Sequence, residues 1–303
     1  MNRLEETADA ASMPAASSLD AVIEAGLMEG TLELPVLPAA ATQILALTSD
    51  ESVDAARLAR LVQGDQTLAS HVLRVANSAA FAPSSTIVSL QHAVTRLGIR
   101  TLGEIALSAS VRSRLFRAPG FEGQVAELWR LALTSGVYAK EIARMRRQNV
   151  EIAFMCGLLH DVGSPLVLGI LEKQCRPPAQ IPGPAERVSL LERFRIRAGV
   201  LLAERWKLPP PVQTAIAFHQ RYQEAVHHRE EAMVTSLATR LAAWLQVDRA
   251  PEDAEDRGET SAAVLEELRQ QPVLGDLNLY PDDLEDLLGQ AETVLQTVQA
   301  MTP

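Results

Sequence analysis

The sequence predicts an all-α protein, and three observations support this fold class. Aromatic residues make up only 4% of the 303 residues, so Leu, Ala, Val and Ile must fill the core, and Ala and Leu are good helix formers. Apolar residues recur near a period of 3.6 in several long segments. Convincing strand alternation of apolar and polar residues is absent from the sequence.

The N-terminal region predicts a polar tail followed by short helices. Residues 1–17 are small, polar and acidic, and we expect them to be disordered. Ser18 is placed to cap the first helix, which we expect to end at Gly30. Pro38 suits the first turn of the next helix, because the N–H that proline lacks would be unpaired there.

The middle of the chain predicts longer helices. One apolar helical segment ends before Gly64, and Ser89 and Gly98 bracket another as a cap and a stop signal. Residues 124–145 carry apolar residues at the spacing of a long amphipathic helix. Residues 150–172 form a largely apolar helical stretch that the segment HDVGSP interrupts.

Two segments rich in helix-breaking residues divide the rest of the chain. Residues 175–186 contain five prolines or glycines and are expected to form a loop. Residues 247–260 are acidic and predict a linker at the main domain boundary. Beyond it, 261–271 and 282–300 predict two amphipathic helices. This extension, 261–303, is too short for a core of its own, so we expect it to dock on the main domain or on a partner.

Composition argues against some classes of protein. The net charge of -10 disfavours a broad nucleic-acid-binding face, because such binding needs Lys and Arg to neutralise phosphates. We find no secretory signal and no membrane span. The two cysteines, Cys156 and Cys175, suit a reducing compartment. We therefore expect a cytoplasmic protein.

Several separated motifs occur in order over about two thirds of the chain, between about residues 33 and 245. They are the segment 34–47 (LPVLPAAATQILAL), then Asp65, Leu68, Leu73, Asn77 and Ser78, the segment 93–98 (AVTRLG), Trp129, the segment 157–163 (GLLHDVG), and Gly199, Trp206, Leu208 and Pro209. In this order they resemble the HDOD family, the HD-related output domains of bacterial signalling proteins.

This resemblance implies a helical fold in two lobes. An N-terminal helical bundle of about residues 18–118 would pack on an HD-like helical core of about 119–246, so that the HDOD domain spans 18–246. The family is regulatory: its members accompany signalling modules or act alone in their pathways. The resemblance implies no general catalytic activity.

The adjacent residues His160 and Asp161 raise the question of a metal site. Active relatives in the wider HD superfamily hydrolyse phosphate esters with divalent metal that His and Asp side chains hold from several helices. Two neighbours on a regular helix diverge, so this pair needs further ligands from other helices.

The resemblance places those further ligands at four positions, and three of them lack a suitable donor. Leu131, Arg195 and Thr239 stand where relatives offer His, His and Asp, respectively. Only His219 is retained, and Ser164 replaces the lysine of many active phosphohydrolases. The sequence thus predicts a vestigial site without metal, in which only His160, Asp161 and His219 remain as ligands.

Arg195 is the strongest argument against metal. A guanidinium about 4 Å from a divalent ion would cost about 8 kcal/mol at an effective dielectric constant of about 20. Our hypothesis is that Arg195 pairs with Asp161 in place of the metal. In the alternative, purely structural interpretation, His160 and Asp161 hydrogen-bond across helices and fix their packing.

Four more residues are candidates for a ligand cleft between the lobes. Asn77 and Ser78 follow an apolar helix, where a helix C-cap explains them equally well. Trp129 and Trp206 are expected in the core or at the lobe interface, with indole N–H groups that need partners. A cluster at 193–197, with Arg at alternate positions, is either a basic spot for phosphate or an acidic protein, or a solvated helix face.

Three functions remain open. The first is a non-catalytic regulatory module that binds signalling proteins, with a nucleotide second messenger as a further candidate ligand. The second is a metal-dependent phosphohydrolase with a reduced ligand set, and the third is a structural dimerisation module. We expect no cofactor, and the sequence leaves the partner and the oligomeric state open.

Overall fold

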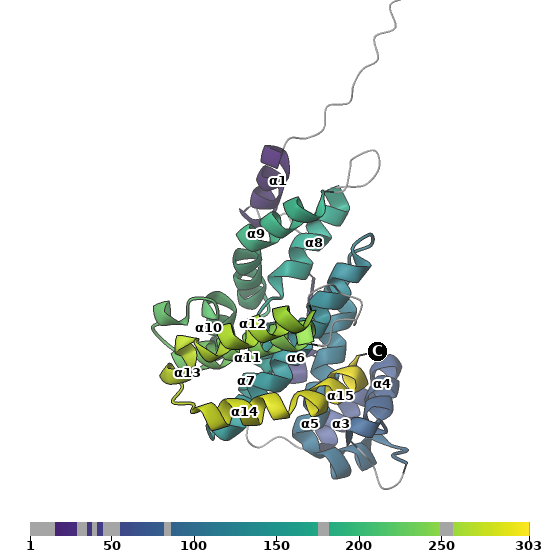
Figure 1. The fold of residues 1–303 in the computed structure, drawn as a ribbon. Helices are drawn as coiled ribbons and strands as arrows, with labels where there is room; N and C mark the ends of the chain where they lie inside the picture. Colours follow the sequence, from purple (N-terminus) through teal and green to yellow (C-terminus); the bar gives the residue numbers. More distant parts are fainter. Residues whose placement is uncertain are drawn as a thin grey trace, which may run out of the picture.

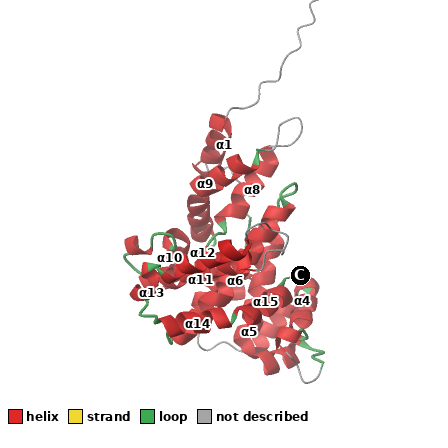
Figure 2. Cartoon of the chain, viewed as in Figure 1, coloured by secondary structure: helices red, strands yellow, loops and turns green. Residues whose placement is uncertain are grey.

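The computed structural model describes residues 16–28, 35–37, 41–44, 55–81, 86–174, 182–248 and 257–302. Every regular element in these ranges is a helix, and they contain no strand, which confirms the predicted all-α class (Figure 2). The predictions for the polar tail up to residue 15, for the helix stop at Gly30 and for the helix start at Pro38 lie outside the described residues.

Short helices and one long helix make up the first part of the chain. They are α1 (Ala16–Met28), α3 (Ala55–Gln63), α4 (Gln66–Ala76), the 3-10 helix η1 (Ala79–Phe81) and α5 (Leu90–Leu115). The cap predicted at Ser18 is wrong, because α1 begins two residues earlier. Ser89 does cap α5 by accepting a hydrogen bond from the His92 N–H.

Gly98 interrupts α5 but does not end it. Its φ of 81° and ψ of 160° lie outside the helical region, and the helix resumes at once and runs to Leu115. The stop predicted there is therefore a kink. Glycine suits this position because a φ near +80° is strained for residues with a Cβ. The first lobe consists of α3 and α4 packed on α5, with Val62 and Leu102 among its buried residues.

The second lobe is the HD-like core. It contains α6 (Glu122–Met145), α7 (Val150–Leu159), α8 (Gly163–Gln174), α9 (Pro184–Arg205), α10 (Pro210–Phe218), the 3-10 helix η2 (Tyr222–Glu224) and α11 (Arg229–Asp248). Helix α7 packs against α6, α10 and α11, and all of its residues from Ala153 to Leu159 are buried. Such a helix is apolar on every side because every side faces protein.

The stretch Val150–Lys173 is long and apolar enough to cross a membrane, with a mean hydropathy of 1.6 over its most apolar window. However, 94% of that window is buried inside the protein, in α7, α8 and the turn between them. Its composition is therefore accounted for by its place in the core of the helical fold.

Helix α1 packs on α8 and α9, at the opposite end of the molecule from α3 to α5 (Figure 1). Charged residues join the helices: Arg193 pairs with Asp20, and Arg197 Nη1 lies 2.7 Å from Glu24 Oε1. Two members of the arginine cluster on α9 thus contact carboxylates of this chain. The Arg193 and Arg197 side chains remain 54% and 49% exposed, so they are still solvated.

The C-terminal extension consists of four short helices. These are α12 (Arg257–Arg269), α13 (Pro272–Asp276), α14 (Pro281–Gly289) and α15 (Ala291–Met301). The single helix predicted over 282–300 is interrupted at Gln290, which caps both α14 and α15. Helical structure also enters the predicted linker from both sides, because α11 runs to Asp248 and α12 begins at Arg257.

Helices of the extension pack on the main domain. Helix α12 lies on α11, while α15 contacts α5, α6 and η1 and buries Val294, Val298 and Met301. Because α5 belongs to the first lobe and α6 to the second, α15 touches both lobes.

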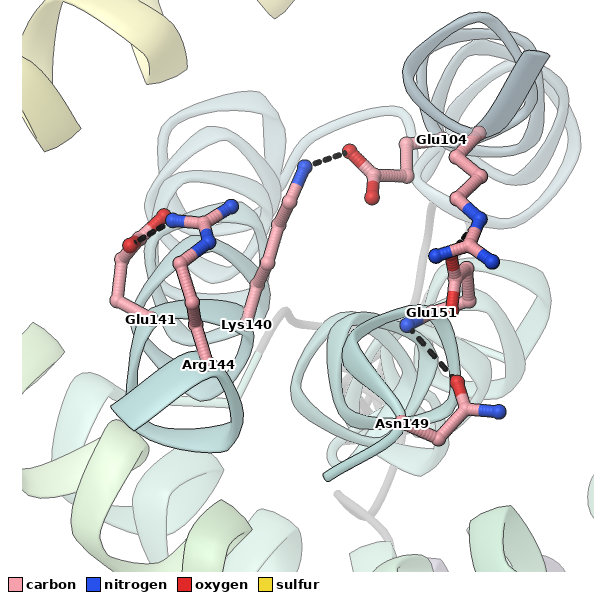
Figure 3. A network of polar contacts seen from close by, with 7 residues as sticks. Glu104, Lys140, Glu141, Arg144, Asn149 and Glu151 are labelled. Atoms are coloured by element: carbon pink, nitrogen blue, oxygen red, sulfur yellow. Dashed lines mark hydrogen bonds and ion pairs between the residues drawn. The ribbon is translucent and has the colours of Figure 1, made fainter. Parts of the chain in front are cut away.

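Polar side chains join α5, α6 and α7 where the lobes meet (Figure 3). Lys140 Nζ on α6 lies 2.6 Å from Glu104 Oε2 on α5, and their side chains are 18% and 9% exposed. Arg100 Nε on α5 lies 2.7 Å from Glu151 Oε1 on α7. Asn149 caps α7 by accepting from the Glu151 N–H. The first of these ion pairs is largely buried, so the loss of either partner would leave the other charge buried without compensation.

Candidate functional site

His160 and Asp161 lie in the tight turn between α7 and α8. The apolar α7 ends at Leu159, and α8 begins at Gly163, so the pair is carried directly by two core helices. The two residues are 3% and 8% exposed, respectively. Buried polar groups need partners inside the protein, and the partners of this pair therefore define its role.

The Asp161 carboxylate is held by a hydroxyl and a guanidinium. Ser164 Oγ lies 2.8 Å from both carboxylate oxygens, and Arg195 Nη1 lies 3.5 Å from Oδ2. The contact expected between Arg195 and Asp161 is therefore present. Burial raises the pKa of Asp161, while the charge of Arg195 and the Ser164 hydrogen bond act in the opposite direction.

His160 and His219 form a neutral pair of imidazoles. Their ring centroids are 5.0 Å apart with the planes at 82°, and each Nδ1 donates to a carbonyl oxygen one turn earlier: Gly157 O at 2.8 Å and Ala215 O at 3.0 Å. Burial lowers the pKa of His160 to about 4 and that of His219 to about 3. Both rings are therefore uncharged near neutral pH, and each leaves its lone pair on Nε2.

Close backbone contacts hold the helices of the site in place. A Cβ at Gly163 would lie 1.8 Å from the Arg195 carbonyl oxygen and 2.6 Å from the Gly199 nitrogen. A Cβ at Gly157 would lie 2.4 Å from the Ser135 carbonyl oxygen. The glycine of the HDVG segment thus lets α9 approach α8 closely enough for Arg195 to reach Asp161.

These residues do not fit a divalent metal ion. In the part of the chain that the structure describes, His160, Asp161 and His219 do not form a group of three donors that could hold one. Arg195 already supplies the positive charge beside Asp161, and a divalent ion there would meet strong repulsion. The side chains at this site instead form an ion pair, Asp161 with Arg195, beside the imidazole pair of His160 and His219.

The other two positions predicted for lost ligands offer nothing to a metal. Leu131 is a half-buried residue of α6 that packs against the core. The Thr239 hydroxyl donates to the Ser236 carbonyl oxygen at 2.8 Å, inside its own helix, α11.

The four residues proposed for a cleft make separate contacts. Asn77 caps α4, and its side chain binds the backbone of Ile87 through both an N–H donor and an acceptor oxygen, each at 2.8 Å. This favours the C-cap interpretation of Asn77, and Ser78 follows directly after it. Trp129 packs edge-on against Phe116, which lies in the segment that connects the first lobe to the second. Their ring centroids are 5.0 Å apart.

Trp206 holds a segment from the start of the chain. Its Nε1–H donates to the Pro35 carbonyl oxygen at 2.8 Å, so the predicted need of this indole for a partner is met. Asn77 and Trp206 therefore have local structural roles, at the ends of α4 and α9.

Sequence reasoning missed two features. The role of Ser164 as the donor to Asp161 follows from its position three residues later, a spacing that places two side chains on the same side of a turn. The pair of Glu104 and Lys140 gave no such signal, because its members lie 36 residues apart on different helices.

Comparisons with known proteins agree with this fold. An HDOD domain protein of unknown function from Geobacter sulfurreducens has a similar structure, with a TM-score of 0.68 and 21% identity, over 94% of this chain and 97% of that one. A provisionally named phosphohydrolase from Shewanella amazonensis is similar with a TM-score of 0.62 and 24% identity, over 93% and 98% of the two chains. At these identities the similarity establishes the fold alone.

The amino-acid sequence is also similar to a bacterial relative and to the HDOD domain family. An uncharacterized protein of Treponema pallidum is 26% identical over 203 residues, which are 64% of this chain but only 39% of that longer protein. The model of the HDOD domain matches residues 34–222, from the segment that begins LPVLP to the 3-10 helix after α10. The chain belongs to the HDOD domain family.

Proposed function

We propose that this protein is a non-catalytic regulatory module of a bacterial signalling pathway, which acts in the cytoplasm by binding a signalling protein. One observation carries the proposal: a guanidinium stands 3.5 Å from the Asp161 carboxylate, where an active relative would need a divalent ion. Without a metal, this site has no group that lowers the pKa of a water or clamps phosphoryl oxygens.

The site is better suited to fixing the fold. Ser164 and Arg195 engage Asp161, and the two histidines donate to carbonyl oxygens of their own helices. The contact of Arg195 with Asp161 links α9 to the turn between α7 and α8, and the ring contact of His160 with His219 links that turn to α10, so the former metal position stabilises the core from which the surface helices project. The similarity to a provisionally named signal transduction protein from Marinobacter aquaeolei, with a TM-score of 0.65 and 22% identity over 96% of this chain and 67% of that one, is consistent with this role.

One observation favours a second candidate, a phosphohydrolase with a reduced ligand set. His160 and His219 each bind a carbonyl through Nδ1, which is the arrangement that orients the Nε2 lone pair of a metal-ligating histidine. This candidate has weaker support because a third ligand is missing among the described residues and Arg195 opposes the charge of a metal.

Metal content and turnover separate the two candidates. The full chain is purified without chelators, and bound transition metals, Mg and Ca are quantified by mass spectrometry alongside assays on cyclic dinucleotides and on a phosphodiester reporter. We expect substoichiometric metal and no turnover above that of His160→Ala. The matched control is His227→Ala, because His227 is exposed and outside the site. Stoichiometric metal that disappears in His160→Ala but not in His227→Ala, with a parallel loss of turnover, would overturn the proposal.

A further inference from the structure

A cavity of about 780 Å³ lies between α4 and α5 in the first lobe, away from the His160–Asp161 turn. One face of α4 and one face of α5 line it, including Ser70 and Arg74 from the former and Ser110 and Arg112 from the latter. Its volume falls within the range of about 300–1,000 Å³ that small-molecule sites occupy.

The cavity is positively charged in a protein whose net charge is -10. Three arginines line it, Arg74, Arg112 and Arg117, against the single carboxylate of Asp65. Asp65 is engaged as the N-cap of α4, where it accepts from the Leu68 N–H at 3.0 Å. Guanidinium groups are therefore concentrated at this cavity, although the chain as a whole carries an excess of negative charge.

Arg112 and Arg117 form no ion pair with any carboxylate of the described residues. Arg112 instead lies over the ring of Trp129, with its guanidinium carbon 5.7 Å from the ring centroid. Burial, and after it the charge of Arg74, lower the pKa of Arg112. Two neighbouring cations that repel each other in a partly desolvated cavity favour the entry of an anion.

Arg74 is held in position by a neutral histidine. Its Nη2 donates to His71 Nδ1 at 2.7 Å, which requires that nitrogen to carry a lone pair. Burial, followed by the charges of Arg74 and Arg112, lowers the pKa of His71 to about 4, so the ring is uncharged near neutral pH. Because Arg74 lines the cavity and is already positioned by His71, its guanidinium loses little freedom on binding an anion.

A second, smaller cavity adjoins the first. It measures about 270 Å³ and shares Arg112, Phe116 and Arg117 with it, so these residues stand between the two. Trp129 lines the smaller cavity, and its Nε1–H is buried without a hydrogen-bond partner in the described structure. Glu122, at the rim, accepts from the Gly120 N–H at 3.0 Å.

We infer that these two cavities form a binding site for a nucleotide. Arg74, Arg112 and Arg117 bind its phosphates in the larger cavity, because guanidinium groups pair with phosphate in a bidentate manner. The base enters the smaller cavity, beside the rings of Phe116 and Trp129. This inference rests on the proposed regulatory function and gives it a ligand.

Calorimetric titration of the full chain tests the inference. The probes are ADP, GDP and cyclic di-GMP, with inorganic pyrophosphate and adenosine as separate arms. We expect saturable binding of at least one nucleotide, weaker binding of pyrophosphate, and none of adenosine. Arg112→Ala and Arg117→Ala should each weaken nucleotide binding about tenfold, the loss expected for one charge-assisted hydrogen bond.

A control variant and thermal unfolding distinguish loss of the site from loss of folding. Arg205→Ala is the matched control, because Arg205 is an exposed arginine on α9 that lines neither cavity. Arg112 stacks on a core tryptophan, so thermal unfolding checks its variant, whereas Arg117 is exposed and its variant should fold normally. Equal weakening in Arg205→Ala would overturn the site, as would the absence of nucleotide binding. Pyrophosphate binding as tight as that of the nucleotides would overturn the assignment of the base to the smaller cavity.

The two proposals fail separately. Loss of the nucleotide site, with no metal and no turnover, would leave the non-catalytic regulatory role standing. Metal-dependent hydrolysis of a bound nucleotide that His160→Ala abolishes and Arg117→Ala only weakens would remove the regulatory role and leave the cavity as a binding site.

Discussion

The Cα of Gly163 faces the carbonyl oxygen of Arg195, and a Cβ at position 163 would lie 1.8 Å from that oxygen. The contact joins α8 to α9 next to the ion pair. Arg195 takes part in both, because its carbonyl oxygen faces Gly163 and its guanidinium lies beside Asp161. The glycine of the HDVG segment is therefore needed for packing in this protein, whatever the chemistry of its relatives.

Gly163→Ala should destabilise the protein by about 3 kcal/mol, because backbone cannot move aside as a flexible side chain can. Gly169→Ala is the matched control in the same helix, since a Cβ there meets nothing within 4 Å. Alanine at 169 should leave the stability unchanged or raise it by up to about 1 kcal/mol. Urea denaturation of both variants measures the difference, and a similar effect at the two positions would contradict the close approach of α8 and α9.

Arg195→Met should destabilise the protein by about 2 kcal/mol at pH 7, because it leaves the Asp161 carboxylate buried without its cation. We expect less than for a fully buried pair, since the Arg195 side chain is 24% exposed. Removing the cation raises the pKa of Asp161 further. A carboxyl that binds its proton more tightly when folded favours the folded state as pH falls, so the deficit should shrink towards pH 4.

Denaturation at pH 7 and pH 4 tests this pH dependence. Asp161→Asn and the double variant complete a double-mutant cycle, in which adding Asp161→Asn should recover part of the loss caused by Arg195→Met. A deficit of Arg195→Met that is the same at both pH values, or the absence of any coupling between positions 161 and 195, would show that the ion pair contributes nothing.

Acid should destabilise the protein through the buried imidazole pair. The pKa of His219 falls from 6.5 in the unfolded chain to about 3, and that of His160 to about 4. The unfolded chain therefore binds more protons below pH 6.5, and folding free energy is lost as pH falls through this window. Each histidine should contribute about 2 kcal/mol of loss between pH 7 and pH 5.

His219→Gln isolates this contribution. The variant should lose less stability than wild type between pH 7 and pH 5, whatever its stability at pH 7. His227→Gln, an exposed position, should lose as much as wild type. Identical pH slopes for wild type and His219→Gln would mean that His219 titrates normally in the folded protein.

Lys140→Met should cost about 3 kcal/mol, because it leaves Glu104 charged and buried at the junction of the lobes. Arg144→Met removes the exposed pair with Glu141 on the same helix and should cost less than about 0.5 kcal/mol (Figure 3). Thermal unfolding compares the two variants. Equal losses would indicate that the Glu104–Lys140 pair is solvated like its exposed neighbour.

The sequence predicted features that depend on local chemistry. The helical class, the cap at Ser89 and the C-cap at Asn77 follow from backbone hydrogen bonding within a few residues, and the structure has all three. The proximity of Arg195 to Asp161 was also predicted, but from a family resemblance. Gly98 was wrongly predicted as a stop because the continuation of α5 depends on packing against α3 and α4, which no local signal encodes.

Features that depend on tertiary contacts escaped prediction. The position of α1 on α9 depends on contacts between residues about 170 positions apart in the chain, of which the ion pair of Asp20 with Arg193 is one. The cavity beside Arg112 arises only when α4 and α5 come together. A single sequence carries no record of which helix faces become neighbours.

Helix α15 holds the two lobes together through its contacts with α5, α6 and η1. Any binding event that displaced this helix would expose Val294 and Val298 together with the apolar surface on which they pack. The lobes would then lose this apolar contact and keep the ion pairs of Glu104 with Lys140 and of Arg100 with Glu151.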